Sequence, residues 1–149
     1  QGDVCIPVLF SLFINELAIE VIENGRHGAL FTIDYFELFI LLLADDIVLL
    51  SETVIGLQTQ LNSLQRAAFS LDLKVNLDKS NIIVFRKGGY LAARERWVYN
   101  NIELPVVNVY KYLGILFSTK LSFTAACNEL VSKAKNAVIM HYDKAPSLE

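Results

Sequence analysis

The sequence is poor in the residues that mark disordered, fibrous and disulfide-rich proteins. Its 149 residues include only seven Gly, three Pro and two Cys, and only 19% are charged. Because 54% are hydrophobic, the composition excludes a disordered chain, and it also excludes collagen-like and low-complexity sequences. Cys5 and Cys127 lie far apart without metal-ligand spacing, so we expect reduced thiols in an intracellular protein, nuclear or cytoplasmic.

Long hydrophobic runs are lacking as well. No apolar run reaches the roughly 18 residues that a membrane-spanning helix requires. The longest run, 38–44, ends at two aspartates. The chain begins with Gln1-Gly2-Asp3, without the basic segment of a signal peptide and without an initial Met. We therefore expect no membrane association, and we expect an excised segment of a longer chain.

The charges are unevenly distributed along the chain. Residues 1–72 carry ten acids against two Arg, a net charge of −8, whereas residues 73–149 carry eleven Lys and Arg against six acids, a net charge of +5. This asymmetry fits a polyanion-binding face in the second half, and it fits equally a chance division between two solvated faces.

Hydrophobic periodicity predicts an α+β fold. Helices are predicted over 8–22, 53–71 and 122–142. The first is apolar on most of its circumference, which predicts burial from several sides. Short apolar runs predict strands over 29–33, 36–43, 46–50, 73–76, 82–86, 96–99, 102–104 and 108–117.

Asp45 and Asp46 separate the two apolar runs of a predicted β-hairpin. Burying an unpaired carboxylate is costly, so the pair should lie at a solvent-facing turn or hold a cation. A polar hairpin tip is one interpretation, although such tips favour Asn-Gly or Asp-Gly. A Mg²⁺ site is the other, since adjacent acids repel without a cation and hard cations prefer oxygen ligands. The small Ala44 beside them would let a substrate approach closely.

Several segments occur in an order typical of one family. They are Gln1-Gly2-Asp3 with Pro7 and VLFSLFINEL, LLLADDIVLL at 41–50, LKVN through Lys79-Ser80 to IIVF, and Tyr110-Lys111-Tyr112-Leu113-Gly114. Together they resemble the reverse transcriptases of non-LTR retroelements, and KLSF at 120–123 resembles the start of their thumb. Three positions depart from the family pattern: Leu43 replaces an aromatic residue, Ile6 a Ser, and Asp72 a common Gly.

The resemblance implies a palm-type antiparallel sheet with packed helices, a partial ferredoxin-like arrangement. It implies a partial palm over 1–117 and the start of the thumb, with a C-terminal helix, over 118–149. The fingers, and the first catalytic strand with its third carboxylate, would lie upstream of Gln1. We therefore expect an α+β segment of an RNA-directed DNA polymerase that is inactive alone. The loss of a central strand leaves unpaired edges, which predicts a homo-oligomer.

The implied activity is two-metal phosphoryl transfer, which adds a dNTP to a DNA primer on an RNA template. Asp45 and Asp46 would be catalytic ligands of Mg²⁺ (or Mn²⁺), and Lys79 would protonate the leaving pyrophosphate. The alternative for Lys79 is a solvated loop lysine. The resemblance places the nucleotide and template contacts at Gln1, Gly2 and Ala44. It places the primer grip at Tyr110, Lys111, Tyr112, Leu113 and Gly114, for which a buried hairpin is the alternative.

Basic and aromatic residues interleave over 86–99. The candidates for contacts with a nucleic-acid backbone are Arg86, Lys87, Arg94 and Arg96. The candidates for stacking on bases are Tyr90, Trp97 and Tyr99. The alternative is a solvated loop with the tryptophan in the core. The competing function for the whole chain is a non-catalytic module, derived from a reverse transcriptase, that binds nucleic acid or associates with itself.

Overall fold

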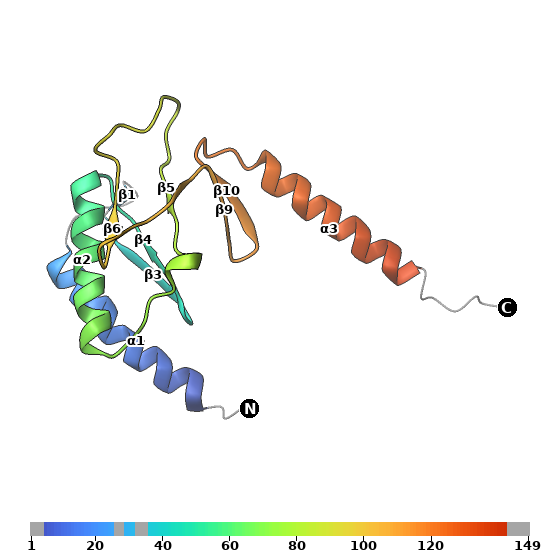
Figure 1. Ribbon diagram of the computed structural model, residues 1–149. Coiled ribbons are helices and arrows are strands. Elements are labelled where there is room, and N and C mark those ends of the chain that lie inside the picture. Colours follow the sequence, from blue (N-terminus) through green and yellow to red (C-terminus); the bar gives the residue numbers. More distant parts are fainter. Residues whose placement is uncertain (1–4, 26–28, 32–35, 143–149) are drawn as a thin grey trace. The chain divides into compact units, whose positions relative to one another are not determined.

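The computed structural model describes residues 5–25, 29–31 and 36–142, and these residues form a mixed α+β fold (Figure 1). The chain divides into two compact units. Unit 1 comprises residues 1–80 and 91–104, and unit 2 comprises residues 81–90 and 105–149. The chain therefore leaves unit 1 after residue 80, returns to it for a short hairpin, and leaves it again.

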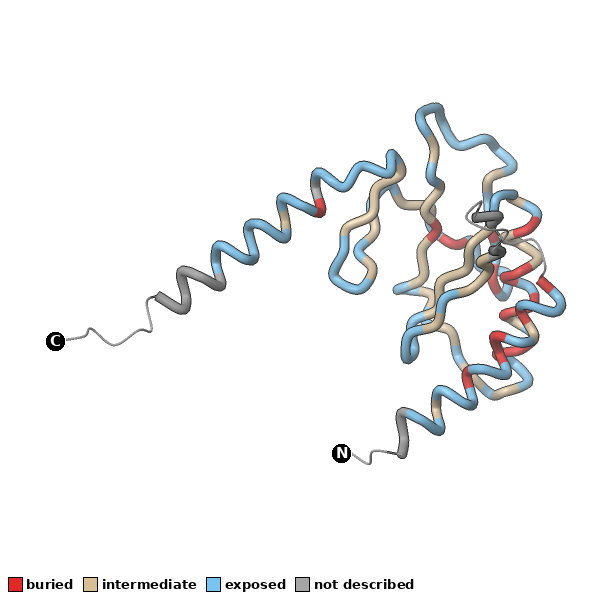
Figure 2. Tube along the Cα trace, turned by 180° about the vertical axis from the view of Figure 1, so that it is seen from behind, coloured by how far each residue is buried: buried red, intermediate tan, exposed pale blue. Residues whose placement is uncertain are grey.

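Two antiparallel helices form the core of unit 1: α1 (Cys5–Asn24) and α2 (Val54–Ser70). Both confirm the helices predicted from periodicity. The buried apolar residues of these two helices are among those shown in red in Figure 2. They are Ile14, Leu17, Ala18 and Val21 of α1, and Leu61, Leu64, Ala67 and Ala68 of α2. An apolar interface of this kind supplies most of the stability of a small unit.

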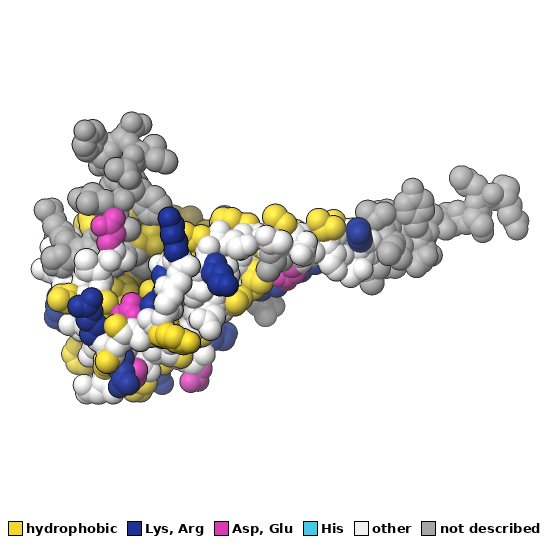
Figure 3. All heavy atoms as spheres, turned by 90° about the horizontal axis from the view of Figure 1, so that it is seen from above, with side chains coloured by type: hydrophobic (Ala, Val, Ile, Leu, Met, Phe, Trp, Pro, Cys, Tyr) yellow, Lys and Arg dark blue, Asp and Glu magenta, His cyan; other side chains and the backbone are white. Residues whose placement is uncertain are grey.

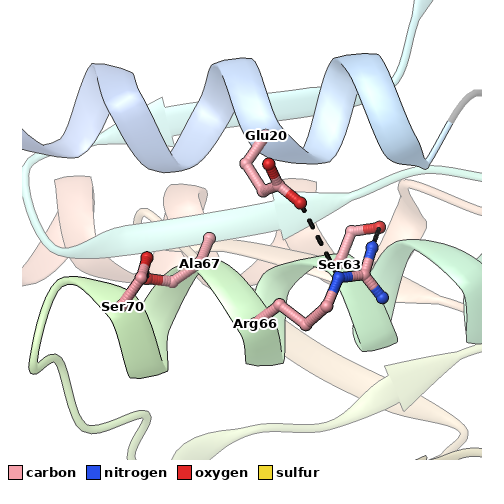
Figure 4. A network of polar contacts seen from close by, with 5 residues as sticks. All are labelled: Glu20, Ser63, Arg66, Ala67 and Ser70. Carbon is pink, nitrogen blue, oxygen red and sulfur yellow. Dashed lines mark hydrogen bonds and ion pairs between the residues drawn. The ribbon is translucent and has the colours of Figure 1, made fainter.

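The close approach of the two helices depends on Gly25. Its amide donates to the Val21 carbonyl at 2.8 Å, and this bond ends α1. A Cβ atom at this position would lie 2.5 Å from that carbonyl and 3.2 Å from the Cα of Gln60. At the rim of the interface, Glu20 of α1 forms an ion pair with Arg66 of α2 (Oε1–Nε 3.7 Å), and Arg66 also donates to the Ser63 hydroxyl (Figure 4).

Both ends of α2 have recognisable caps. The Thr53 hydroxyl accepts the Gly56 amide at 2.9 Å, as an N-cap does. At the other end, the Leu73 amide donates to the Ala68 carbonyl and the Asp72 amide to the Phe69 carbonyl. These are the two bonds of a Schellman motif, and Asp72 takes its left-handed position with φ of 53°. Glycine is the usual residue at this position, so Asp72, which departs from the family pattern, takes the place of a glycine that ends the helix.

The strands of unit 1 pair two by two. β1 (Ala29–Phe31) pairs with β2 (Phe36–Leu38), β3 (Ile40–Leu43) with β4 (Asp46–Leu49), and β6 (Val98–Tyr99) with β7 (Ile102–Glu103), all antiparallel. The long run predicted over 36–43 is therefore divided between two hairpins. The strand predicted over 73–76 is wrong, since that segment is irregular and leads into a short 3₁₀ helix, η1 (Leu77–Lys79).

The β6–β7 hairpin is held on α2 by side chains. The Trp97 indole donates to the Val54 carbonyl at 3.0 Å, and Trp97 itself is buried. The Gln58 amide group bonds both backbone groups of Val98, donating to its carbonyl at 2.8 Å and accepting its N–H at 2.9 Å. Gln65 accepts the Asn100 amide in the same manner. Glutamine side chains thus replace a strand partner along this edge.

The described residues of unit 2 form two pairs of strands and one helix. β5 (Ile82–Ile83) runs parallel to β8 (Val106–Val107), and β9 (Val109–Tyr112) pairs with β10 (Ile115–Ser118) in an antiparallel hairpin. The helix α3 (Thr124–Tyr142) follows, as predicted. A T-shaped contact between Phe117 and Phe123, with ring centroids 6.2 Å apart, joins β10 to the segment before α3. Most described residues of α3 are exposed (Figure 2).

The expectation that the first helix is buried from several sides is wrong. Among the described side chains of α1, the buried ones lie on one face, and Val8, Leu9, Leu12 and Ile19 are exposed. Exposed hydrophobic side chains are also visible in Figure 3, where they lie among Lys and Arg. Each unit therefore leaves apolar surface in contact with solvent.

Candidate active site and nucleic-acid interface

The acidic pair lies at the tip of the β3–β4 hairpin. Leu43 pairs with Asp46, so Ala44 and Asp45 form a two-residue turn between the strands. Ala44 has φ of 51°, a left-handed conformation that glycine normally adopts at the first central position of such a turn. Both aspartates are exposed. The pair therefore lies at a solvent-facing turn, as predicted. The residue with the strained backbone is Ala44, next to the carboxylates.

The β3–β4 register determines which residues lie on the same face of the hairpin as Asp46. Residues directly opposite each other share a face, so Leu41, Leu43, Asp46 and Val48 lie on one side of the hairpin. Leu41 and Leu43 are exposed there, at 40% and 53%. An open apolar face with one carboxylate on it, and a second at the turn, leaves room for a polar ligand to reach both acids.

The chemistry of this tip fits a weak cation site. Carboxylate oxygens are suitable ligands for Mg²⁺ or Mn²⁺, and an exposed position leaves the other coordination positions to water. Among the described residues, no group of three or more His, Cys, Asp or Glu side chains gathers as a metal site would require. The hairpin thus offers two adjacent acids without a described third ligand.

Lys79 is the next predicted catalytic residue along the described chain. Lys79 is exposed at the end of η1, where the Ser80 hydroxyl donates to the Asn76 carbonyl at 2.8 Å and fixes the turn. Gln1 and Gly2 lie outside the described residues.

The predicted primer grip forms the β9–β10 hairpin of unit 2. Leu113 and Gly114 are its turn, with φ of 50° and 82°, as a type I′ turn requires. Tyr110 and Tyr112 are half-buried, and Lys111 is exposed. The segment is therefore a hairpin with alternating burial, half-buried at its tyrosines and exposed at its turn, which is compatible with a primer grip and with a partly buried hairpin together.

A charged network links this hairpin to α3. Lys111 bonds the Glu129 carboxylate, whose Oε1 atom also lies 3.0 Å from the Lys133 amine. The hydrogen bond to Glu129 raises the pKa of Lys111, and the bonds from Lys111 and Lys133 lower the pKa of Glu129. This link was not predicted from the sequence, although Glu129 and Lys133 have the spacing of a helical ion pair.

The candidate backbone contacts fall into both units. Arg86 and Lys87 belong to unit 2, whereas Arg94 and Arg96 belong to unit 1, where Arg96 lies 3.7 Å from Glu103. Trp97 and Tyr99 are buried at 3% and 7% exposure. Burial also raises the pKa of the Tyr99 phenol. Trp97 belongs to the core of unit 1, as the alternative interpretation holds, and Tyr99 is buried there as well, whereas Tyr90 is the exposed member of the group.

The division into units sharpens the charge asymmetry. Unit 1 carries thirteen acids against six Lys and Arg, a net charge of −7, and unit 2 carries seven Lys and Arg against three acids, a net charge of +4. Both units are counted over their full sequence. The acidic pair thus lies in the acidic unit, and the predicted primer grip lies in the basic one.

Comparison with known proteins identifies the family. None of the helices in the described part of the chain combines the length and apolar character needed to cross a bilayer. Searches of curated proteins and of solved structures found no significant match. The family profile described as "Reverse transcriptase (RNA-dependent DNA polymerase)" matches residues 1–117, which are most of the chain. The chain therefore belongs to the reverse transcriptase family.

Proposed function

We propose that residues 1–149 are part of the polymerase region of a reverse transcriptase of the non-LTR type. Residues 1–117 are assigned to a partial palm, and 118–149 to the start of the thumb. The observation that carries the proposal is the Ala44-Asp45-Asp46 turn at the tip of an exposed antiparallel hairpin, inside the segment that matches the family. The intracellular location expected for such a protein is part of the same proposal.

The aspartates have distinct roles in this proposal. Asp45, at the turn, is the main metal ligand, and Asp46, at the start of β4, is the supporting carboxylate. Reverse transcriptases in general use Mg²⁺. When bound, the ion lowers the pKa of the primer hydroxyl and stabilises charge on the phosphates. In the mechanism of the family a third carboxylate completes the site, and we assign turnover to a chain that also supplies it.

The other assigned residues act on the substrates. Lys79 donates a proton to the leaving pyrophosphate, and Ala44 presents a small surface to the incoming dNTP. Gln1 and Gly2 complete the contacts with the dNTP and the RNA template. The β9–β10 hairpin, residues 110–114, holds the sugar-phosphate of the DNA primer, for which backbone amides and Lys111 are suitable donors.

A non-catalytic role is the second candidate function. The exposed apolar face of α1 supports it, because apolar surface of this kind is typical of an interface with another chain. In this candidate, the chain forms a homo-oligomer and binds nucleic acid through its basic unit without polymerising.

The metal site is tested directly with Mn²⁺ and amide NMR spectra of the 149-residue chain. We expect a dissociation constant on the order of millimolar, as for sites with few protein ligands, and paramagnetic broadening centred on residues 43–47. Asp45→Asn should remove most of it, and Asp46→Asn less. Asp78→Asn is a matched control, since Asp78 is an exposed acid of η1 in the same unit. Broadening that persists in Asp45→Asn/Asp46→Asn contradicts the metal assignment.

Primer extension separates the two candidate functions. A parent chain that includes the third carboxylate should extend a DNA primer on an RNA template in Mg²⁺, and Asp45→Asn should abolish extension. Lack of extension by that parent, together with intact nucleic-acid binding, favours the non-catalytic module.

A further inference from the structure

The loop Arg86–Tyr90 is an open, basic and aromatic surface of unit 2. Tyr90 is 99% exposed, Lys87 is exposed, and Phe85, which precedes the loop, is 42% exposed. A Cβ atom added at Gly88 or Gly89 would meet no atom within 4 Å. Figure 2 shows this part of the chain mostly in the colour of exposed residues. An aromatic side chain held in water loses the burial that normally stabilises it, and it is available to a ligand.

Hydrogen bonds hold the loop in shape and join it to the predicted primer grip. The Arg86 guanidinium donates to the Tyr90 carbonyl at 2.8 Å and closes the loop. The Arg86 amide donates to the Thr119 carbonyl at 2.9 Å, and the Thr119 amide donates to the Asn108 carbonyl at 3.0 Å. Asn108 and Thr119 immediately flank β9 and β10, so the loop is anchored at the base of that hairpin, within the same unit.

The electrostatics of this surface favour a polyanion. Within unit 2, residues 81–90 include Arg86 and Lys87 and no Asp or Glu. The described side chains of unit 2 include six Lys and Arg and one acid, Glu129. Glu129 already binds Lys111 and Lys133. An exposed tyrosine beside an exposed lysine is a combination that proteins use to bind single strands, with bases stacked on the ring and phosphates near the cations.

We propose that the Arg86–Tyr90 loop binds single-stranded nucleic acid, with Tyr90 stacked on a base and Lys87 beside a phosphate. The inference rests on the proposed function and extends it: an unpaired segment of the bound nucleic acid lies across the loop, next to the base of the β9–β10 hairpin. Because every base has a π face, the loop accepts any sequence.

Fluorescence anisotropy of labelled 12-nucleotide oligo(dT) and oligo(U) tests the proposal with the 149-residue chain. Tyr90→Ala should weaken binding by about fivefold or more, and Tyr90→Phe should retain most of the affinity because the ring is kept. Tyr90→Ala should leave the salt dependence unchanged. Lys87→Gln should reduce the slope of log K against log salt by about 0.7, the value for one phosphate of a single strand.

Phe69→Ala is the matched control, since Phe69 is an aromatic residue of α2 in unit 1 with 88% exposure. It should bind like the wild type. A wild-type chain that binds while Tyr90→Ala retains full affinity overturns the loop proposal alone. A wild-type chain that binds neither oligonucleotide at low salt overturns the nucleic-acid role in the proposed function as well. A change in sedimentation instead of binding in Tyr90→Ala would overturn the proposal in favour of a protein contact.

Discussion

The interface between α1 and α2 can be tested with two leucines of the same helix. Leu17 is 1% exposed and faces α2, whereas Leu12, five residues earlier, is 65% exposed. Leu17→Ala removes a fully buried side chain and leaves a cavity, so it should lower the free energy of unfolding by about 2–5 kcal/mol. Leu12→Ala makes the same chemical change at the surface and should cost no more than about 0.5 kcal/mol. Because domains of this kind are stable by only about 5–15 kcal/mol, the Leu17 variant should lose a large share of that stability.

Urea denaturation followed by circular dichroism measures both losses, and it should be repeated over a hundredfold range of protein concentration. In a monomer the midpoint does not depend on concentration. Equal losses in the two variants at every concentration would refute the placement of α1. If the Leu12→Ala loss grows with concentration, the outer face of α1 is covered by a second copy, as the predicted homo-oligomer requires.

Three further predictions concern single side chains. Asp72→Gly should raise the free energy of unfolding by up to about 1 kcal/mol, since a left-handed conformation is costly for Asp and free for Gly, and a loss measured by urea denaturation would contradict the Schellman motif. Tyr99→Phe should be less sensitive to alkaline pH than the wild type: the buried phenol has a pKa above its ordinary value of 10.0, so stability is complete below that pH and is lost above it as the unfolded chain ionises first. Equal pH profiles would show that Tyr99 is solvated. Lys111→Met should raise the pKa of Glu129 toward its ordinary value, as measured by NMR titration of the side-chain carboxyl, and an unchanged titration would exclude the link between the hairpin and α3.

Much of the local structure could be predicted because it depends on neighbouring residues. Apolar spacing is sufficient to predict α2, and the acidic interruption of two apolar runs is sufficient to predict the β3–β4 turn. The turn conformation was not predictable from residue preference, because Ala44 occupies a position that usually requires glycine. The adjacent acids indicated a cation site at this tip, and the family resemblance gave that site a catalytic role.

Pairings across long stretches of sequence could not be predicted. The β6–β7 hairpin docks on α2 through Gln58 and Gln65, which in the sequence look like ordinary solvent-facing residues of an amphipathic helix. The sequence likewise shows that α1 is apolar on most of its circumference, without showing which face packs against another element. Trp97 illustrates the same limit, since its place among basic residues fits stacking and burial equally well until the contact with Val54 is known.

The way the chain alternates between its units has a consequence for its synthesis. Unit 1 includes Trp97, Tyr99 and Leu104, which are among its buried residues, so its core is incomplete until residue 104 has left the ribosome. By then β5 of unit 2 has already emerged and awaits its partner strand, β8. Since domains generally fold as units during translation, unit 1 completes its core while β5 of unit 2 still waits for residues 105–149. A chain that stops at residue 80 would lose part of the core of unit 1 as well as all of unit 2.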